Sequence, residues 1–397
     1  MTVAEQTAGR LGRTTRAGAS RYLLLTGAKL NAGDFLIKRR SMELLRALRP
    51  DAELRPYDRW KPLDAASVEW ADTVVLCGGP ALQPRIYPDI YPLRPALADV
   101  APSIVGFGLG WKGAPGDEWT ERTYRFRQGG RRLLARLVED GQPVSCRDPA
   151  TERVLHASGV HRTVMTGDPA WFDLDHVDRP FEAPRAVDAL LVSMPAAPMF
   201  FGQSLRLLRA LRDLPAVHSL VAVFNHGWTS GAHLDARRAA AYQRLRSSVA
   251  DLGVEPVDAS GGVERMLELA SACDLHVGYR LHTHLLFLSR RKPSLLIEED
   301  GRGSAAGQAL ELPGVRAWER PRRVRILLPG LRAAGPLGRP LQRRVQARIR
   351  ASENVVGSVL ADLERYRDEG FSAFSAVGRR MTDVYREKMR PFIVSLP

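Results

Sequence analysis

Short apolar runs that end in glycine recur along this chain, and helical patterns separate them. RYLLLTG (21–27) is the first such run, and a helical pattern follows it from about Asp34 to Leu48. Buried parallel strands have this nearly continuous apolar character, because helices cover both faces of their sheet. The alternation therefore predicts an α/β chain with parallel, doubly wound sheets.

The alternation occurs in two blocks. In the first block, further strands are predicted at 72–80, at 103–110, within 142–160 and at 162–171. The polar segment 173–188 contains proline, lacks periodicity and is typical of an interdomain linker. The second block has strands predicted in ALLVSMP, SLVAVFNHG, VEPVDA, LHVGY and PSLLIEE. We therefore expect a flexible tail (1–20), two Rossmann-like domains (21–172 and 189–314) and a basic, mainly helical C-terminal segment (315–397).

Composition excludes several classes of protein. The first twenty residues lack the apolar region of a signal peptide, and no apolar run reaches the roughly 18 residues that span a bilayer. Cys77, Cys146 and Cys273 lie far apart and form no C-x-x-C pair, which argues against a disulfide framework or a zinc ribbon. We expect a cytoplasmic protein. Only six of the 58 basic residues are lysine, so the basic residues are almost all arginine. The net charge of +14 fits either a solvated arginine surface or attraction to an anionic partner.

Polar and glycine residues stand where the carboxyl ends of the predicted strands should meet. In chain order these motifs are Asn31-Ala32-Gly33-Asp34, Gly78-Gly79, Gly106-x-Gly108-x-Gly110, Arg147-Asp148 and Asp168-Pro169-Ala170. Open α/β sheets bind ligands beyond this edge. Each motif alone is also compatible with ordinary turns, and we expect Asp148 to cap a helix and Asp168 to form a turn before Pro169.

The segment CDLHVGYRLHTHLL places Arg280 and His282 at the junction between a predicted strand and a helix. His282 falls in the first turn of that helix, where free N–H groups and the helix dipole favour an anion. An arginine beside such a helix start matches a carboxylate or a phosphate. The alternative is structural, with Arg280 paired to an acid and His282 capping the helix.

Taken in order, these motifs resemble those of the polysaccharide pyruvyl transferase family. The matching elements are Asn31-Ala32-Gly33-Asp34, Cys77-Gly78-Gly79-Pro80, Ser145-Cys146-Arg147-Asp148, Asp168-Pro169-Ala170, Arg280-Leu281-His282 and Pro293-Ser294-Leu295. The resemblance spans roughly 20–305. It implies two Rossmann-like domains in a GT-B-like arrangement and transfer of the enolpyruvyl group of phosphoenolpyruvate to saccharide hydroxyls, usually as a ketal, in cell-surface polysaccharide or glycoconjugate biosynthesis.

The resemblance also suggests roles for single residues. Phosphoenolpyruvate carries a carboxylate and a phosphate, for which Arg280 and Arg147 are the candidate cations. His282 is the candidate for proton transfer, and Asp34 is a candidate base, sugar ligand or helix cap. The remaining residues that we assign to substrate binding are Asn31, Gly33, Gly78, Gly79, Gly108 and Arg302. No cofactor or metal is implied, and the acceptor is a saccharide, with a lipid-linked form as one option.

One stretch departs from the family pattern. Where members often have an aromatic–Asp–x–Lys sequence, this chain has Glu298-Glu299-Asp300-Gly301-Arg302, so Arg302 is the candidate replacement for the lysine. The alternative enzyme class is a GT-B glycosyltransferase that uses a nucleotide sugar. A metal site formed by Cys273, His276, His282 and His284 is disfavoured, because histidines two residues apart at such a junction converge poorly.

The C-terminal segment raises a third, non-catalytic alternative. Residues 316–350 contain eleven arginines and one acid, Glu319. Leu341, Val345 and Ile349 recur every four residues with Arg343, Arg344, Arg348 and Arg350 beside them, as in a basic amphipathic stripe that could contact an anionic membrane. An ordinary helix packed on the core is the competing interpretation. Nucleic acid is the weakest option, because Trp318 is the only aromatic residue in the segment.

Overall fold

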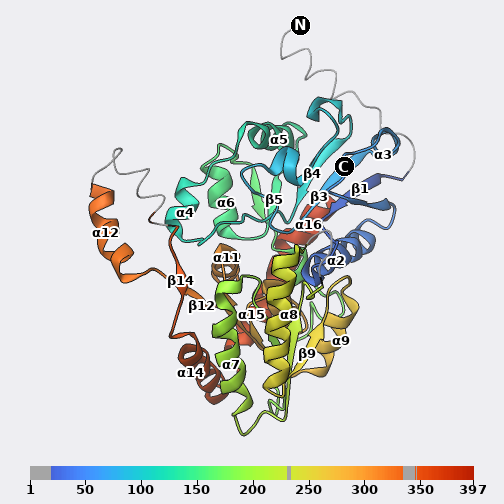
Figure 1. Ribbon diagram of the computed structural model, residues 1–397. Helices are drawn as coiled ribbons and strands as arrows, with labels where there is room; N and C mark the ends of the chain where they lie inside the picture. The colour runs from blue at the N-terminus through green and yellow to red at the C-terminus, as the bar shows by residue number, and fades with distance from the viewer. Residues whose placement is uncertain (1–18, 230–233, 334–344, 346) are drawn as a thin grey trace.

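Each of the two domains is built on a larger parallel sheet, of four strands in the N-terminal domain and of six in the C-terminal domain, among the residues that the structure describes (Figure 1). The computed structural model describes residues 19–229, 234–333, 345 and 347–397. The N-terminal sheet has the order β2-β1-β3-β4, and β5 pairs separately with β6. Its strands are β1 (Arg21–Thr26), β2 (Glu53–Asp58), β3 (Thr73–Cys77), β4 (Ser103–Phe107), β5 (Val144–Cys146) and β6 (Thr163–Met165). The strands within each sheet pair in parallel, as the sequence predicted.

The strand β2 was not predicted from the sequence. It is polar, contains Pro56 and lies at the edge of the sheet, so it lacks the apolar run that marks the buried strands. The helical elements of this domain are α2 (Ala32–Leu48), α3 (Ala65–Trp70), η1 (Ile86–Ile90), η2 (Leu97–Asp99), α4 (Glu118–Thr123), α5 (Gln128–Glu139), α6 (Pro149–His156) and η3 (Pro169–Trp171). Helix α2 begins two residues earlier than predicted, because the Asn31 side chain caps it.

The C-terminal sheet has six strands in the order β12-β11-β10-β7-β8-β9. They are β7 (Ala189–Ser193), β8 (Ser219–Phe224), β9 (Glu255–Asp258), β10 (Leu275–Gly278), β11 (Ser294–Glu298) and β12 (Val315–Arg316). The helical elements are η4 (Pro198–Phe200), α7 (Phe201–Arg212), α8 (Ala236–Asp251), α9 (Glu264–Ala272), α10 (Leu281–Ser289) and α11 (Gly301–Leu310). The strand order places β10 between β7 and β11, so the residues that follow β10 lie centrally at the carboxyl edge of the sheet.

After β12 the chain continues through further elements, and the last of them packs on the N-terminal domain. These elements are α12 (Arg322–Ala333), β13 (Trp318–Glu319) paired with β14 (Arg350–Ala351), α14 (Val355–Asp368), α15 (Ser372–Val384), η5 (Tyr385–Met389) and α16 (Arg390–Val394). In Figure 1, α16 lies beside β1 and β3, and the Phe392 ring stacks on that of Phe107 with centroids 6.1 Å apart. The Tyr22 hydroxyl donates to the Pro397 carbonyl over 2.6 Å. These features confirm the predicted fold class, with two Rossmann-like domains and a helical C-terminal segment.

The predicted amphipathic stripe at 341–350 is only partly within the described residues. Leu341, Arg343 and Arg344 lie outside them. Val345 is buried with Val324 and Leu328 of α12, and Ile349 packs against the main core. The chain is not helical over 347–350, so the stripe does not continue to Arg350. The apolar members that the structure describes are therefore covered by protein.

Glu298 ends β11 and is buried, with 6% of its surface exposed. Gly314 N–H donates to its Oε1 over 3.1 Å, but burial dominates and raises the pKa of the carboxyl to about 7. The folded state therefore holds a proton on Glu298 at pH values where the unfolded chain has lost it. This contribution to stability is fully present below about 4.5 and is lost as the pH rises to about 7.

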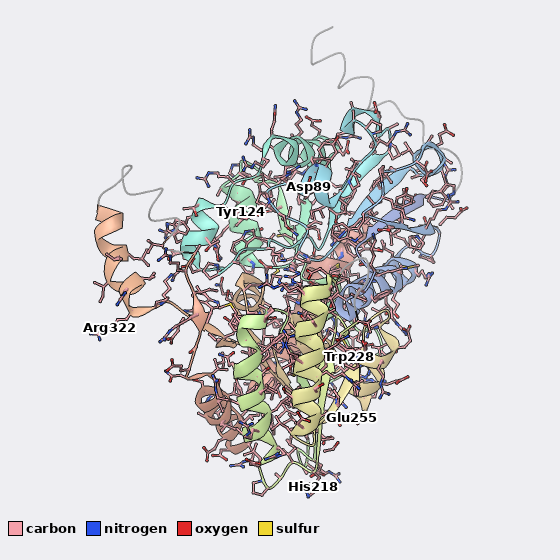
Figure 2. The ribbon with its side chains drawn as sticks, viewed as in Figure 1. Asp89, Tyr124, His218, Trp228, Glu255 and Arg322 are labelled. Atoms are coloured by element: carbon pink, nitrogen blue, oxygen red, sulfur yellow. The ribbon has the colours of Figure 1, made fainter. Side chains whose placement is uncertain are left out.

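We expect the Glu298→Gln variant to lose this pH dependence. Its unfolding free energy relative to wild type should rise by roughly 2–3 kcal/mol between about pH 5 and pH 8, because the amide never ionises. Urea unfolding at both pH values measures the effect. Glu255→Gln is the matched control, since Glu255 is exposed at the far end of the same domain (Figure 2). Equal pH dependence in wild type and Glu298→Gln would contradict the expectation.

Candidate active site

Arg280 lies between β10 and α10, and its side chain reaches the other domain. Its Nη2 donates to Asn31 Oδ1 over 3.3 Å, and its Nη1 lies 3.8 Å from Glu299 Oε2. Glu299 is itself held by the backbone N–H groups of Ala196 and Ala197. The arginine therefore bridges the first loop of the N-terminal domain and the end of β11. The alternative left open by the sequence, a structural pairing of Arg280 with an acid, is present as this contact with Glu299.

The Asn31-Ala32-Gly33-Asp34 motif forms the start of α2. Gly33 N–H donates to Asn31 Oδ1, and Asn31 Nδ2 donates to Asp34 Oδ2 over 3.2 Å. Asn31 is thus the helix cap, and Asp34 lies in the first turn, half-buried. A side chain at Gly33 would place its Cβ 2.8 Å from His282 Nδ1. The glycine of the motif is needed because His282 of the other domain packs against it.

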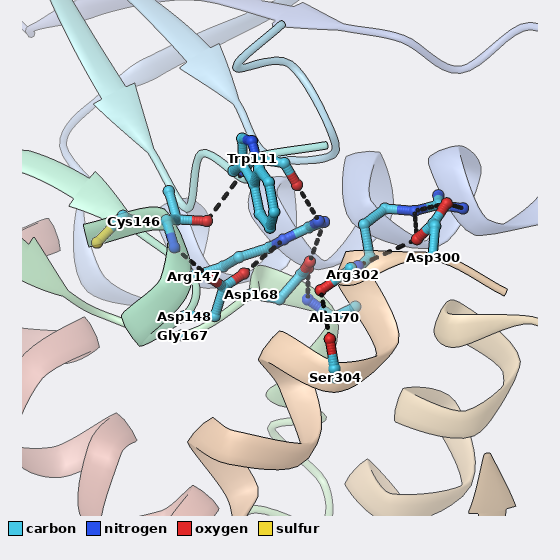
Figure 3. A network of polar contacts seen from close by, with 12 residues as sticks. Trp111, Cys146, Arg147, Asp148, Gly167, Asp168, Ala170, Asp300, Arg302 and Ser304 are labelled. Carbon is cyan, nitrogen blue, oxygen red and sulfur yellow. Dashed lines mark hydrogen bonds and ion pairs between the residues drawn. The ribbon is translucent and has the colours of Figure 1, made fainter. Parts of the chain in front are cut away.

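Arg147 lies between two carboxylates (Figure 3). Its Nε is 3.3 Å from Asp148 Oδ2, its Nη1 is 3.3 Å from Asp168 Oδ2, and its Nη2 donates to the Trp111 carbonyl. Only 3% of the Arg147 side chain is exposed. Asp148 caps α6 and Asp168 caps η3, as predicted. The sequence did not predict that the same carboxylates would hold Arg147.

His282 meets Asp168 across the domain boundary. Its Nε2 is 3.5 Å from Asp168 Oδ2, the oxygen that also faces Arg147, and it has no hydrogen-bond partner among the described residues. Burial alone would raise the pKa of Asp168, but His282 and Arg147 outweigh it, and the pKa lies below its ordinary value. Asp168 therefore remains an anion beside the imidazole, with its Oδ2 3.5 Å from Nε2.

The predicted glycines shape the loop that carries Asp168. Gly78, Gly79 and Gly108 all have positive φ angles (38°, 71° and 60°). A Cβ at Gly108 would lie 2.5 Å from Pro169 Cδ, and one at Gly78 would lie 2.7 Å from an Ile37 methyl. Gly108 therefore lets the end of β4 pack closely against Pro169 of η3, and Gly78 lets the end of β3 pack closely against Ile37 of α2.

Arg302 folds back onto the cap of its own helix. Asp300 caps α11 by accepting from Arg302 N–H, and the Arg302 guanidinium binds both Asp300 oxygens over 2.8–3.0 Å. Gly301 N–H donates to the Gly113 carbonyl of the N-terminal domain over 3.0 Å, so the two domains touch here. In the stretch that departs from the family pattern, Asp300 thus pairs with Arg302, the candidate replacement for the lysine.

Lys112 and His226 were not predicted as site residues from the sequence. In the structure, both experience the charges of Arg280 and Arg302. The pKa of His226 is lowered well below its ordinary value, first by burial and then by the charges of Arg280 and Arg302. The pKa of Lys112 is also lowered, by burial and by Arg302. His226 follows β8 and Lys112 follows β4, so each stands beyond the carboxyl end of a strand. This position beyond a strand end was the feature of the sequence that could have identified both residues.

Metal binding has no support within the part of the chain that the structure describes. No group of three or more His, Cys, Asp or Glu side chains converges there as a metal site. His276 and His284 both bond the Ser294 hydroxyl over 2.7 Å.

Comparison with known proteins identifies the family. The family model described as polysaccharide pyruvyl transferase matches residues 31–301, which include every predicted site residue except Arg302. The chain belongs to the polysaccharide pyruvyl transferase family. This polysaccharide pyruvyl transferase homologue is therefore a transferase, and the matched region includes residues of both domains. No curated protein compared with the chain matches it.

Several solved structures are similar in fold to this pyruvyl transferase family member. A glycosyltransferase from Rickettsia africae is 12% identical, with a TM-score of 0.45, and the match covers 95% of this chain and 100% of the other. A putative UDP-N-acetylglucosamine 2-epimerase from Listeria monocytogenes is 13% identical, with a TM-score of 0.41, and the match covers 89% and 98%. An O-GlcNAc transferase mutant from Thermobaculum terrenum is 15% identical, with a TM-score of 0.39, and the match covers 95% and 68%.

Proposed function

We propose that this protein transfers the pyruvyl carbons of phosphoenolpyruvate to a saccharide acceptor, forming a ketal. The observation that carries the proposal is the meeting of His282 with Asp168, whose Oδ2 also faces Arg147, while Arg280 reaches Asn31 from the same strand–helix junction as His282. Arg147 and Arg280 come from different domains and supply two cations, which matches a donor with a carboxylate and a phosphate. No cofactor is needed, because the donor itself supplies the leaving group.

The reaction can be balanced with the residues at this site. A proton added to the vinyl carbon makes the neighbouring carbon electrophilic, and a sugar hydroxyl adds there. Phosphate leaves, and a second hydroxyl adds to close the ketal. We assign proton transfer to His282, with Asp168 beside it as the carboxylate that faces the imidazole. Asp34, in the first turn of α2, is the candidate to accept a hydroxyl proton or bind the sugar.

Electrostatics favour an anionic donor at this boundary. Arg280, Arg302 and Lys112 all lower the pKa of His226, although Glu299 pairs with Arg280 and Asp300 pairs with Arg302. A departing phosphate would leave into this positive field, which stabilises charge as it develops. The proposed role of Arg302 is therefore to support the field from the Asp300 cap, with Arg280 contacting the donor directly.

Phosphate release tests the proposal. We expect inorganic phosphate to appear when the protein, phosphoenolpyruvate and a matching saccharide are combined, across a panel of free, nucleotide-linked and lipid-linked sugars. With donor labelled at carbon 2, ¹³C spectra should show a new ketal carbon on the acceptor. If calorimetry detects no donor binding, and nucleotide sugars are consumed instead, the protein is a glycosyltransferase.

We further propose that the protein works at an anionic membrane surface, as a lipid-linked acceptor would require. Helix α12 stands apart from both sheets, with Arg322 at its start (Figure 2). Ile326 and Leu327 are 67% and 55% exposed, and Arg322 and Arg323 beside them are exposed too. Exposed apolar and cationic side chains on one short helix suit an interface between water and anionic headgroups. Among the described residues, no helix is both long and apolar enough to cross a bilayer.

We expect the protein to sediment with vesicles that contain anionic lipid, and less so as salt rises. Arg322→Glu with Arg323→Glu should weaken binding by roughly 2 kcal/mol or more, because each arginine near the headgroups contributes about 1 kcal/mol. Ile326→Ser with Leu327→Ser should also weaken it. Arg244→Glu with Arg246→Glu is the control for net charge, since both are exposed on α8. No sedimentation at low salt would rule out the membrane and favour a soluble acceptor.

A further inference from the structure

A continuous line of hydrogen bonds connects the backbone of Arg280 with the interior of the C-terminal domain. Arg280 N–H donates to Ser193 Oγ over 2.9 Å, and Ser193 Oγ lies 2.8 Å from His276 Nε2. His276 Nδ1 lies 2.7 Å from Ser294 Oγ, which is also 2.7 Å from His284 Nδ1. The two serines and two histidines are at most 2% exposed. None of these four residues was assigned a role by the sequence.

The backbone N–H of Arg280 can only donate, and this fixes the direction of the other hydrogen bonds in the series. Because Ser193 Oγ accepts from the Arg280 amide, its own hydrogen is available for His276 Nε2. His276 then carries its proton on Nδ1 and donates to Ser294, whose hydroxyl donates to His284 Nδ1. The reverse arrangement would leave the buried Ser193 hydrogen without an acceptor, which is costly. Burial lowers the pKa of both histidines, that of His284 to about 3, so both rings are neutral.

The backbone around Ser193 is built for this contact. Gly278, at the end of β10, has φ 154°, and a Cβ there would lie 2.5–2.6 Å from the backbone and hydroxyl of Ser193. The absence of a side chain lets β7 approach the turn closely enough for Ser193 to reach Arg280. Apolar side chains could fill this space without hydrogen-bond partners. The continuous series of hydrogen bonds is therefore not needed for core packing alone.

We propose that Ser193 and His276 are positioning residues, which hold the Arg280 backbone so that its guanidinium faces Asn31 and Glu299. Ser193 accepts from the amide directly, and His276 fixes the Ser193 hydroxyl so that its lone pair faces that amide. Ser294 and His284 fix the tautomer of His276 in turn. This inference rests on the proposed function only where it concerns donor affinity.

Two measurements test the inference without substrate. In ¹⁵N-labelled histidine spectra, His276 should be the Nδ1–H tautomer and His284 the Nε2–H tautomer. Hydrogen exchange should show a protected Arg280 amide in wild type and faster exchange in Ser193→Ala. Ser289→Ala is the matched control, because it removes a buried hydroxyl at the other end of α10, where Ser289 donates to the Leu286 carbonyl.

Donor affinity provides the third measurement. Calorimetry should show that Ser193→Ala raises the Kd for phosphoenolpyruvate about five- to tenfold, the scale of one lost hydrogen bond, while Ser289→Ala stays within about twofold. Unchanged affinity in Ser193→Ala overturns the inference, even with faster exchange, because the anchoring would not reach the guanidinium. An Nε2–H tautomer of His276 also overturns it. If wild type binds no donor, the proposed function fails, and the tautomer and exchange results alone decide the inference.

Discussion

Changing His282 to alanine is expected to lower turnover by roughly a hundredfold or more while the protein remains folded. The imidazole is the titratable group that meets Asp168 at the domain boundary, with Nε2 3.5 Å from the carboxylate. Removing it takes away proton transfer but leaves Arg147 to balance Asp168. Steady-state phosphate release measures the loss, and thermal unfolding verifies the fold.

Two further variants separate chemistry from packing. His218→Ala is the matched control, because His218 is exposed at the end of the C-terminal domain remote from the site (Figure 2). Gly33→Ala keeps His282 but places a Cβ 2.8 Å from its ring, so it should also lower turnover. Its own control is Gly357→Ala on α14, where an added Cβ meets no atom within 4 Å. If His282→Ala turns over like wild type, His282 serves only to pack against α2.

Changing Arg280 to alanine is expected to weaken phosphoenolpyruvate binding by about 2–3 kcal/mol, the scale of a charge-assisted contact. The change should be tolerated by the fold, because Glu299 keeps its bonds from Ala196 and Ala197 N–H. Calorimetry measures the affinity. Arg244→Ala on α8 removes the same charge from an exposed position and should have little effect. Wild-type affinity in Arg280→Ala would place the donor elsewhere.

We expect Arg147→Ala to weaken donor binding by a similar amount, and it should also destabilise the protein. Arg147 balances Asp148 and Asp168, all three almost fully buried, and removing one partner of such a group typically costs about 3–5 kcal/mol. The affinity of Arg147→Ala for the donor must therefore be measured under conditions in which unfolding curves show that the variant is folded. Equal stability in Arg147→Ala and wild type would contradict the buried pairing.

Local chemistry made part of this structure predictable. The apolar runs gave the buried strands, and Asp148 and Asp168 cap the elements that follow them, as short polar residues at such positions do. The resemblance to the family, which rests on the order of the motifs, also led us to predict one site for Asn31, Arg280 and His282. Edge strand β2 could not be found this way, because an edge strand with proline needs no apolar run.

Long-range contacts account for what the sequence could not supply. Nothing near Asp168 indicates that its Oδ2 would face both Arg147 and His282, and nothing near Gly33 indicates the ring that excludes a side chain there. Arg302 was foreseen as a lysine replacement, but its neutralisation by Asp300 depends on how α11 begins. Lys112 carries no local motif, and only the folded structure brings it near Arg302.

The pairing of His282 with Asp168 and of Arg280 with Asn31 has a consequence for the rate of the reaction. Both contacts join the two domains, and His282, Asp168 and Arg280 are buried. We therefore expect the domains to separate before substrate reaches these side chains and again before product leaves. Such movements are opposed by the friction of the surrounding liquid. Turnover by the wild type should therefore decrease as glycerol or sucrose raises the viscosity of the medium. Turnover by His282→Ala, which should be limited by the chemical step, should not depend on viscosity.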